Sequence, residues 1–541
     1  MPSLAFLLLL IPLTAPAQRQ ERIVDTWKPL HYDVNITFNN QLTEISTAKT
    51  EITAIVLKDG VKTIDLDFGA MPIDSVKLDG GPTHYDRQPD LLNVALPHPF
   101  KNGEKVNIAV NYHGRPTDGL VFATDRDGKP SVTGDNWPNR VHQWIPCLDH
   151  PSAKATVSFT VTVPQRDAVV ANGKFINITR NAATSYWRYA EEKAIPPYCM
   201  VIVVNEGARV DATEPTVTPL SYHVPQRDRS YATKGFSPAA PALALFSETV
   251  APYPYEKLGL IIGATKYGGM ENSSAIVFTS TLFDQHPGEP MSARFGIPTR
   301  IESVVAHEIA HQWFGDSVTE STWGDLWLSE GFATYFAGLF IEKYDGEEAF
   351  RAYMSSAAER YFVYENQHRG PIRDTETLDL NQLLNPNNYE KGAWVLHMLR
   401  KRLGDDAFFK GLREYYRAHH EANATTEDLR AALEKASRQN LREFFARWVY
   451  ASGHPKYEFS WSWKNEPEKG GALTISLQQT QPGDVFLDPV PVVIDLNGDA
   501  RHELIKPTGK STSQQFSLVS RPQSVQIDPD ETILKEVIAK P

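Results

Sequence analysis

Residues 304–317, VVAHEIAHQWFGDS, hold the most informative pattern in this chain of 541 residues. The segment contains His307, Glu308 and His311. Side chains four residues apart project from the same side of a helix, so the two imidazoles converge on one point. Imidazole nitrogen is a preferred zinc ligand, and Glu308 stands beside the pair, placed to take a proton from a water that zinc activates. The alternative is a helix that carries these three residues by chance.

A catalytic zinc site needs a third protein ligand, and Glu330 is the candidate. It lies in the segment WGDLWLSEGFATYF, residues 323–336, with 18 residues between it and His311. A helical pattern over 330–343 places Glu330 near the start of a second helix, which can bring its carboxylate to the first two ligands. Thr334, one turn further on, is a candidate to hydrogen-bond this carboxylate. Taken alone, Glu330 is better explained as a solvated carboxylate at a helix N-terminus.

Two further motifs accompany these segments, and the set resembles a known family. Residues 268–272, GGMEN, lie upstream of the histidine motif, and residues 389–393, YEKGA, lie downstream of Glu330. Together with HEIAHQWFGD and WLSEGFATYF, they resemble the gluzincin zinc aminopeptidases, the family of aminopeptidase N and leukotriene hydrolase. The segment IPCLDHPSAKATVSFTVTVP, residues 145–164, is similar to the end of that family's N-terminal β domain. The resemblance extends from about residue 32 to about residue 455.

The resemblance implies a role for each matched residue. It implies one Zn²⁺ per chain, held by His307, His311 and Glu330. Glu308 would act as the general base, and Tyr389 would stabilise the oxyanion of the tetrahedral intermediate. The substrate-binding residues that it implies are Gly268, Gly269, Met270, Glu271 and Asn272.

Physical chemistry gives reasons for several of these roles. An aminopeptidase must bind a free α-ammonium, and the Glu271 carboxylate can pair with that cation and block a longer chain. Gly268 and Gly269 lack side chains, so an extended substrate can approach their backbone. Residue type alone is equally consistent with an exposed turn carboxylate at Glu271, a simple turn at the two glycines and an aromatic ring packed in the core at Tyr389.

The resemblance implies a zinc-dependent aminopeptidase that removes the N-terminal residue from peptides with a free N-terminus. A zinc endopeptidase or an epoxide hydrolase could use the same metal site, and a peptidase-like binding protein without turnover is a further alternative. Glu271 separates the aminopeptidase from the endopeptidase, because N-terminally blocked peptides are poor substrates for an aminopeptidase. The metal and catalytic positions all hold functional side chains, which argues against the binding protein.

The sequence departs from the family pattern in two places. Ser329 stands directly before the third ligand, where the family usually has asparagine, and we expect a changed local hydrogen bond there. Trp137 stands where the family places a glutamine or glutamate that helps to bind the amino group of the substrate. Asp135 or Asn136 could replace that contact. Trp137 could wall the first side-chain pocket or pack in the core of the β domain.

Alternating apolar residues mark both ends of the chain as β structure. The segments HYDVNITF at 31–38 and VSFTVTV at 157–163 are typical of strands with one buried face. They predict an antiparallel N-terminal β domain over residues 18–215. The alternation returns after residue 455, where the resembling family has a large helical domain. We expect a small C-terminal β-sandwich over residues 453–541 instead.

The middle of the chain has a helical period. Helices are expected at 347–364 and 391–403, and a third after a capping box formed by Thr425 and Asp428. Residues 216–452 therefore form the predicted zinc metallopeptidase domain. The fold class that follows is multidomain α+β, with an N-terminal antiparallel β domain, a thermolysin-like α-rich catalytic domain and a small C-terminal β-sandwich.

The N-terminus has the pattern of a secretory signal. Residues 4–13, LAFLLLLIPL, are apolar and precede Ala15-Pro16-Ala17, a small-residue cleavage site. We expect cleavage after Ala17, so residues 1–17 form the signal peptide and the protein is exported to the periplasm or the medium. A buried N-terminal strand and a retained anchor are the alternatives. The remaining sequence has no long apolar run, so no integral membrane span is expected in the mature chain.

Composition excludes several other classes of protein. The formal net charge is −12, with 66 acidic against 54 basic residues, whereas a nucleic-acid binder usually carries a basic face. Cys147 and Cys199 are the only cysteines, which excludes a disulfide scaffold and a cysteine-rich zinc site but leaves one bridge open. Peptides are thus the expected partners and nucleic acid is not. Nothing in the sequence specifies an oligomeric state.

Overall fold

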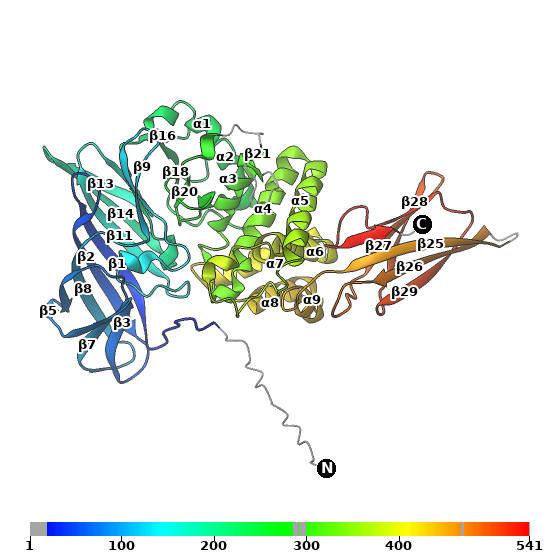
Figure 1. Ribbon diagram of the computed structural model, residues 1–541, viewed down its shortest axis with the longest axis horizontal. Helices are drawn as coiled ribbons and strands as arrows, with labels where there is room; N and C mark the ends of the chain where they lie inside the picture. The colour runs from blue at the N-terminus through cyan, green and yellow to red at the C-terminus, as the bar shows by residue number, and fades with distance from the viewer. Residues whose placement is uncertain (1–18, 285–289, 292–298, 467–469, 540–541) are drawn as a thin grey trace, which may run out of the picture.

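The computed structural model describes residues 19–284, 290–291, 299–466 and 470–539. A β-rich N-terminal part, a helical central part and a β-rich C-terminal part follow one another along the longest axis of the molecule (Figure 1). This order is the predicted multidomain α+β architecture. The predicted signal peptide, residues 1–17, lies outside the described residues. No helix within the described ranges is long and apolar enough to cross a bilayer.

An eight-stranded sheet dominates the N-terminal part, in the order β13-β14-β11-β1-β2-β8-β4-β5. Its strands are β1 (Trp27–Phe38), β2 (Ile45–Val56), β4 (Ile73–Leu78), β5 (Gly81–Pro82), β8 (Lys105–Gly114), β11 (Ala155–Pro164), β13 (Lys174–Arg180) and β14 (Thr184–Ile195). Tyr32, Val34 and Ile36 on β1 are buried as their alternation predicts. The sheet is antiparallel except between β1 and β11, which pair in parallel. Alternation sets which face is buried but not strand direction, so the sequence did not reveal this pairing.

Two smaller sheets complete this part of the molecule. One has the order β3-β7-β6 and the other the order β12-β15-β10-β9. Their strands are β3 (Val61–Asp67), β6 (Tyr85–Gln88), β7 (Leu91–Phe100), β9 (Leu120–Thr124), β10 (Pro130–Gly134), β12 (Ala168–Ala171) and β15 (Ile202–Asn205). Cys147 and Cys199 are both buried and both free, so they form no disulfide.

A mixed sheet in the order β16-β17-β18-β20-β19 forms one side of the central part. Its strands are β16 (Ala208–Asp211), β17 (Leu220–Val224), β18 (Leu258–Gly263), β19 (Gly269–Met270) and β20 (Ala275–Thr279). Residue 215, the predicted end of the N-terminal β domain, lies between two strands of this one sheet, because β16 pairs with β17. The edge strand β19 contains the middle of the GGMEN motif and lies against helix α3.

Nine α-helices in the described ranges build the rest of the central part. They are α1 (Ala232–Gly235), α2 (Ala239–Thr249), α3 (Ile301–His311), α4 (Trp327–Asp345), α5 (Glu347–Glu365), α6 (Gly392–Leu403), α7 (Asp405–His419), α8 (Thr426–Ser437) and α9 (Arg442–Trp448). The helices expected at 347–364 and 391–403 are α5 and α6. The capping box ahead of α8 is confirmed, since Thr425 and Asp428 exchange the two expected hydrogen bonds.

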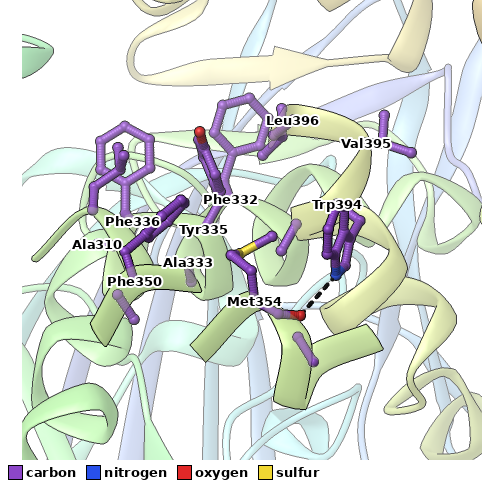
Figure 2. Packing of buried hydrophobic residues seen from close by; sticks show 14 of the residues in the cluster. Ala310, Phe332, Ala333, Tyr335, Phe336, Phe350, Met354, Trp394, Val395 and Leu396 are labelled. Atoms are coloured by element: carbon purple, nitrogen blue, oxygen red, sulfur yellow. Dashed lines mark hydrogen bonds between the residues drawn. The ribbon is translucent and has the colours of Figure 1, made fainter. Parts of the chain in front are cut away.

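Helix α4 is the centre of the core. Residues 327–341 are all buried, which is typical of a helix surrounded by other elements on every side. Phe332 and Phe336 on α4 pack within the same cluster as Phe350 of α5 (Figure 2). The indole of Trp394 on α6 donates a hydrogen bond to the backbone oxygen of Met354 on α5, at 2.9 Å. This packing holds rigidly the helix that carries Glu330.

Helices α4 and α6 meet at two glycines. A Cβ on Gly331 would lie 2.9 Å from the Cα of Gly392, and a Cβ on Gly392 would lie 2.9 Å from the Cα of Gly331. Side chains at these positions would force the helices apart. The close approach brings η8, a π-helical turn at Asn387–Lys391, next to the N-terminal end of α4.

The C-terminal part contains two facing β-sheets. One has the order β29-β26-β25-β31 and the other the order β28-β27-β30. Their strands are β25 (Lys456–Glu466), β26 (Gly470–Gln479), β27 (Val490–Leu496), β28 (Asp499–Ile505), β29 (Ser511–Leu518), β30 (Ser524–Ile527) and β31 (Glu536–Ala539). Leu473, Ile475 and Leu477 are buried, as the predicted alternation requires. The small β-sandwich is confirmed.

Candidate metal centre and active site

Three nitrogen and oxygen atoms converge where α3 meets α4. His307 Nε2 lies 3.0 Å from His311 Nε2 and 3.3 Å from Glu330 Oε2. His311 Nε2 lies 3.4 Å from the same carboxylate oxygen. The two histidines are one turn apart on α3, and Glu330 is in the first turn of α4. The sequence-predicted ligands are therefore brought together and form a group able to hold a metal ion.

These separations fit a zinc ion. Ligands at about 2.0–2.1 Å in tetrahedral geometry lie about 3.3–3.4 Å from one another. The observed 3.0–3.4 Å between the three atoms matches that spacing. Two imidazoles and one carboxylate, with a fourth position left open, form a typical catalytic zinc site.

Neighbouring groups fix the orientation of His311. Its Nδ1 lies 3.0 Å from Ser329 Oγ and 3.2 Å from the backbone oxygen of Phe314. A proton on Nδ1 leaves Nε2 as the metal-facing lone pair. Ser329 thus makes the changed hydrogen bond expected at this position. The contact expected from Thr334 is wrong, because its buried hydroxyl finds no hydrogen-bond partner in the described part of the chain.

Glu308 lies under strand β19. It is 6% exposed, and burial raises the pKa of its carboxyl well above the ordinary value. A Cβ on Gly269 would lie 2.5 Å from Glu308 Cγ and closer still to the carboxylate. Gly269 therefore makes room for Glu308. Among the described residues, no atom lies within 4 Å of a Cβ placed on Gly268, so of the two glycines only this one leaves its backbone open to a substrate.

Glu271 completes a second group next to the first. One carboxylate oxygen from each of Glu271 and Glu308 lies within 4.8 Å of a His311 ring nitrogen and of each other. Burial raises the pKa of Glu271, His311 opposes that shift, and the negative charge of Glu330 adds to it. Burial also favours a neutral Glu330, but His311 and His307 outweigh burial and lower its pKa. This set of closely spaced carboxylates requires cations for compensation, either a metal or a substrate ammonium.

Tyr389 lies beside His307. The two rings are stacked, with centroids 5.8 Å apart and planes 4° from parallel. The π-helical turn η8 directs both Tyr389 and its neighbour Glu390 toward the same cavity. Such turns are rare and are frequently found at functional sites. The aromatic-core alternative for Tyr389 is therefore wrong.

A cavity of about 420 Å³ joins these groups. The predicted site residues that line it are Gly268, Gly269, Met270, Glu271, His307, Glu308, His311, Glu330 and Tyr389. Asn272 does not line it. This side chain is fully buried and donates a hydrogen bond to the backbone oxygen of Met270 at 3.2 Å, so it supports the shape of the motif.

Trp137 forms part of the cavity wall. Its ring packs edge-on against Trp323 and Tyr267, with centroids 5.7 and 6.2 Å away. Neither candidate for the missing amine contact lines the cavity. Asp135 pairs with Arg140 at 3.1 Å, and Asn136 bonds to the backbone oxygen of Met200. Of these three residues, only Trp137 therefore lines the cavity.

Sequence reasoning missed an ion pair in the same cavity. Arg360 on α5 donates from Nε to Glu390 Oε1 at 2.8 Å, and both side chains line the cavity. Glu390 belongs to the YEKGA motif, which was the one available signal. Arg360 lies in an ordinary helical segment 30 residues earlier, and no local pattern connects the two.

The histidine pair and base on α3, in the pattern HExxH, are joined by a glutamate from a second helix, α4. This combination is typical of the zinc metallopeptidases. Two family models match the chain: the peptidase M1 N-terminal domain at residues 28–199 and the peptidase family M1 domain at residues 238–448. Together these matches span more than half of the sequence. The chain belongs to the peptidase M1 family, and zinc is its cofactor.

Similar proteins include curated relatives and solved structures. Aminopeptidase M1 of Arabidopsis thaliana is 31% identical over 59% of this chain and 36% of its own length. Probable aminopeptidase 1 of Saccharolobus solfataricus is 25% identical over 78% of this chain and 53% of its own. The chain thus spans about half, or less, of these relatives. A mutant of the M1 zinc metallopeptidase from Deinococcus radiodurans, bound to a Tyr-Ser-Ala substrate, is 25% identical with a TM-score of 0.68, covering 80% of this chain and 95% of that one.

Proposed function

We propose that this protein is a zinc-dependent aminopeptidase that removes the N-terminal residue from peptides. The position of Glu271 carries the proposal. In a peptide, the α-ammonium nitrogen is only two bonds from the first carbonyl carbon. A carboxylate that binds this ammonium must therefore lie about one residue from the catalytic base. The oxygens of Glu271 and Glu308 lie within 4.8 Å of each other, which meets that requirement.

The chain's own residues supply the remaining chemistry. A zinc ion held at this site would polarise the scissile carbonyl and make water a better nucleophile. We assign His307, His311 and Glu330 to hold it. Glu308 accepts the proton of the attacking water and delivers it to the leaving amine. Tyr389, beside His307, donates its hydroxyl to the oxyanion.

Glu271 selects the substrate by charge. Glu271 is 6% exposed, so an ammonium that pairs with its carboxylate is largely removed from water. An acetylated N-terminus carries no positive charge and places a methyl group against a buried carboxylate. Such a peptide loses the ion pair and leaves Glu271 uncompensated, so we expect discrimination of about a hundredfold or more.

A comparison of free and acetylated peptides tests this proposal. The tripeptide Tyr-Ser-Ala, which the Deinococcus protein binds, is a suitable first substrate, with N-acetyl-Tyr-Ser-Ala as its control. The proposal expects release of tyrosine from the free peptide alone, and a Glu271→Gln variant that loses most of this preference. Glu308→Ala should retain zinc and lose nearly all turnover. Equal cleavage of both peptides by the wild-type protein would favour an endopeptidase and refute the proposal.

We also propose that the protein is exported. The apolar segment at 4–13 and the small residues at 15–17 support removal of residues 1–17, so N-terminal sequencing of the processed protein should begin at Gln18. Retention of Met1 would contradict this. For the domains, we propose boundaries between β15 and β16, near residue 206, and near residue 453. Pairing of β16 with β17 supports moving the first boundary from 215.

A further inference from the structure

A positive charge stands in a cavity otherwise dominated by carboxylates. Arg360 is 9% exposed, and it lines the same cavity as Glu271 and Glu308. Its Nε–H is occupied by Glu390, at 2.8 Å. The four N–H groups on Nη1 and Nη2 make no hydrogen bond to any residue that the structure describes. The forked end of this side chain is therefore available to a ligand.

One ion pair, with Glu390, holds the arginine in place. Its side chain is 10% exposed and that of Glu390 is 13% exposed, so the pair is largely shielded from solvent. Tyr353, on the same helix and the same wall, uses its hydroxyl on the backbone oxygen of Thr334 at 3.0 Å and does not compete for the guanidinium. A shielded guanidinium whose terminal nitrogens bond to none of the described residues matches the two oxygens of a carboxylate.

We propose that Arg360 binds the C-terminal carboxylate of short peptide substrates. This inference rests on the proposed aminopeptidase function. Glu271 takes the ammonium end of the peptide, and Arg360 takes the carboxylate end. A peptide residue adds at most about 3.6 Å of length, so both contacts within one cavity select peptides of a few residues. The substrates are then zwitterionic short peptides rather than the ends of folded proteins.

Lys266 is the other cation on the cavity wall, but its surroundings differ. Its side chain is exposed, whereas Arg360 is shielded. A flexible, solvated ammonium at the rim provides a weaker and less directional contact than a shielded guanidinium. Lys266→Gln is therefore a matched control, because it removes a positive charge from the same cavity.

The test compares alanine tripeptide with its C-terminal amide on the zinc-loaded enzyme. Wild type should show a kcat/KM about ten- to a hundredfold higher for the free acid, from loss of a charged hydrogen-bonded contact in the amide. Arg360→Gln should bring this ratio close to one, and Arg360→Lys should give an intermediate ratio. Lys266→Gln should keep the wild-type ratio. Most of the effect should appear in KM.

The ratio of kcat/KM for the free acid to that for the amide shows whether Arg360 binds the substrate or has only a structural role. If Arg360 only positions Glu390 and the Tyr389 turn, Arg360→Gln will slow acid and amide equally, and the proposal fails. It also fails if wild type cleaves both peptides at equal rates. A tripeptide amide with aspartate at its third position carries a side-chain carboxylate but no C-terminal carboxylate. If the enzyme cleaves it as fast as the tripeptide free acid, Arg360 does not distinguish the C-terminal carboxylate and the proposal is overturned. An alanyl reporter without a carboxylate is measured in parallel, since its inertness would refute the aminopeptidase function itself.

Discussion

The substitution Gly269→Ala tests how closely strand β19 packs against the proposed base. The new Cβ would lie 2.5 Å from Glu308 Cγ and nearer still to the carboxylate. Ordinary van der Waals contacts of a Cβ lie at 3.4–4 Å, so the two groups must separate by about 1 Å. Either Glu308 moves away from the substrate or β19 moves outward with Glu271.

A displacement of this size has a calculable cost. Misplacing a catalytic group by about 1 Å costs about a hundredfold in rate, which equals about 2.7 kcal/mol of transition-state stabilisation. We expect kcat to fall about a hundredfold, because Glu308 acts in the chemical step. Zinc content should not change, since the methyl group is directed at Glu308 and not at the three metal ligands.

Two matched variants accompany this measurement. Gly509→Ala, in the C-terminal part, places a methyl group more than 4 Å from every atom that the structure describes outside its own chain neighbours, and it controls for the glycine-to-alanine change itself. Gly268→Ala places a methyl group within 4 Å of no atom in the described ranges, so we expect its effect to report contact with the substrate and to appear in KM. Steady-state kinetics with an alanyl reporter give both constants. A kcat for Gly269→Ala within about threefold of wild type, with zinc bound, would refute the proposed steric coupling.

Three other perturbations have defined outcomes. Ser329→Ala removes the 3.0 Å contact to His311 Nδ1 and should weaken zinc binding about tenfold in chelator competition; an unchanged affinity would mean that the Phe314 oxygen alone orients the ring. Gly331→Ala, with its methyl group 2.9 Å from Gly392 Cα, should destabilise the central domain by about 1–3 kcal/mol in thermal unfolding, and a midpoint equal to that of Gly509→Ala would contradict the close packing. His223 has its pKa lowered to about 3 by burial, so its stabilising contribution is complete above pH 6.5 and is lost as the pH falls toward 3. His223→Gln should therefore reduce the slope of the unfolding free energy against pH by about 1.4 kcal/mol per pH unit between about pH 6 and 4. Equal slopes for the variant and the wild type would show that His223 does not have a lowered pKa in the folded protein.

The sequence predicted the metal centre well because local geometry determines most of it. His307 and His311 are one helical turn apart, so any helix at this position brings them together. Glu330 required only that a second helix pack against the first. The alternating strands and the capping box at Thr425 followed from similarly short-range rules.

The remaining features depend on how distant elements cross. Arg360 meets Glu390 because α5 packs against the turn η8, and no pattern in either segment encodes that contact. The role of Gly269 likewise depends on the distance between β19 and α3. Strand direction in the β1–β11 pair and the aromatic wall at Trp137 were also set by tertiary packing. Sequence reasoning located the metal ligands, the base and Glu271, while the structure was needed for Arg360, for the role of Gly269 and for the wall at Trp137.

The most direct test of the proposed function is a zinc titration of the metal-depleted protein, with Tyr-Ser-Ala and N-acetyl-Tyr-Ser-Ala assayed at each step. The ligand geometry at His307, His311 and Glu330 predicts that tyrosine release rises linearly and saturates at one zinc per chain. Glu271, beside the base, predicts that the acetylated peptide stays uncleaved throughout. Activity that is independent of zinc, or equal cleavage of the two peptides at saturation, would contradict the aminopeptidase assignment.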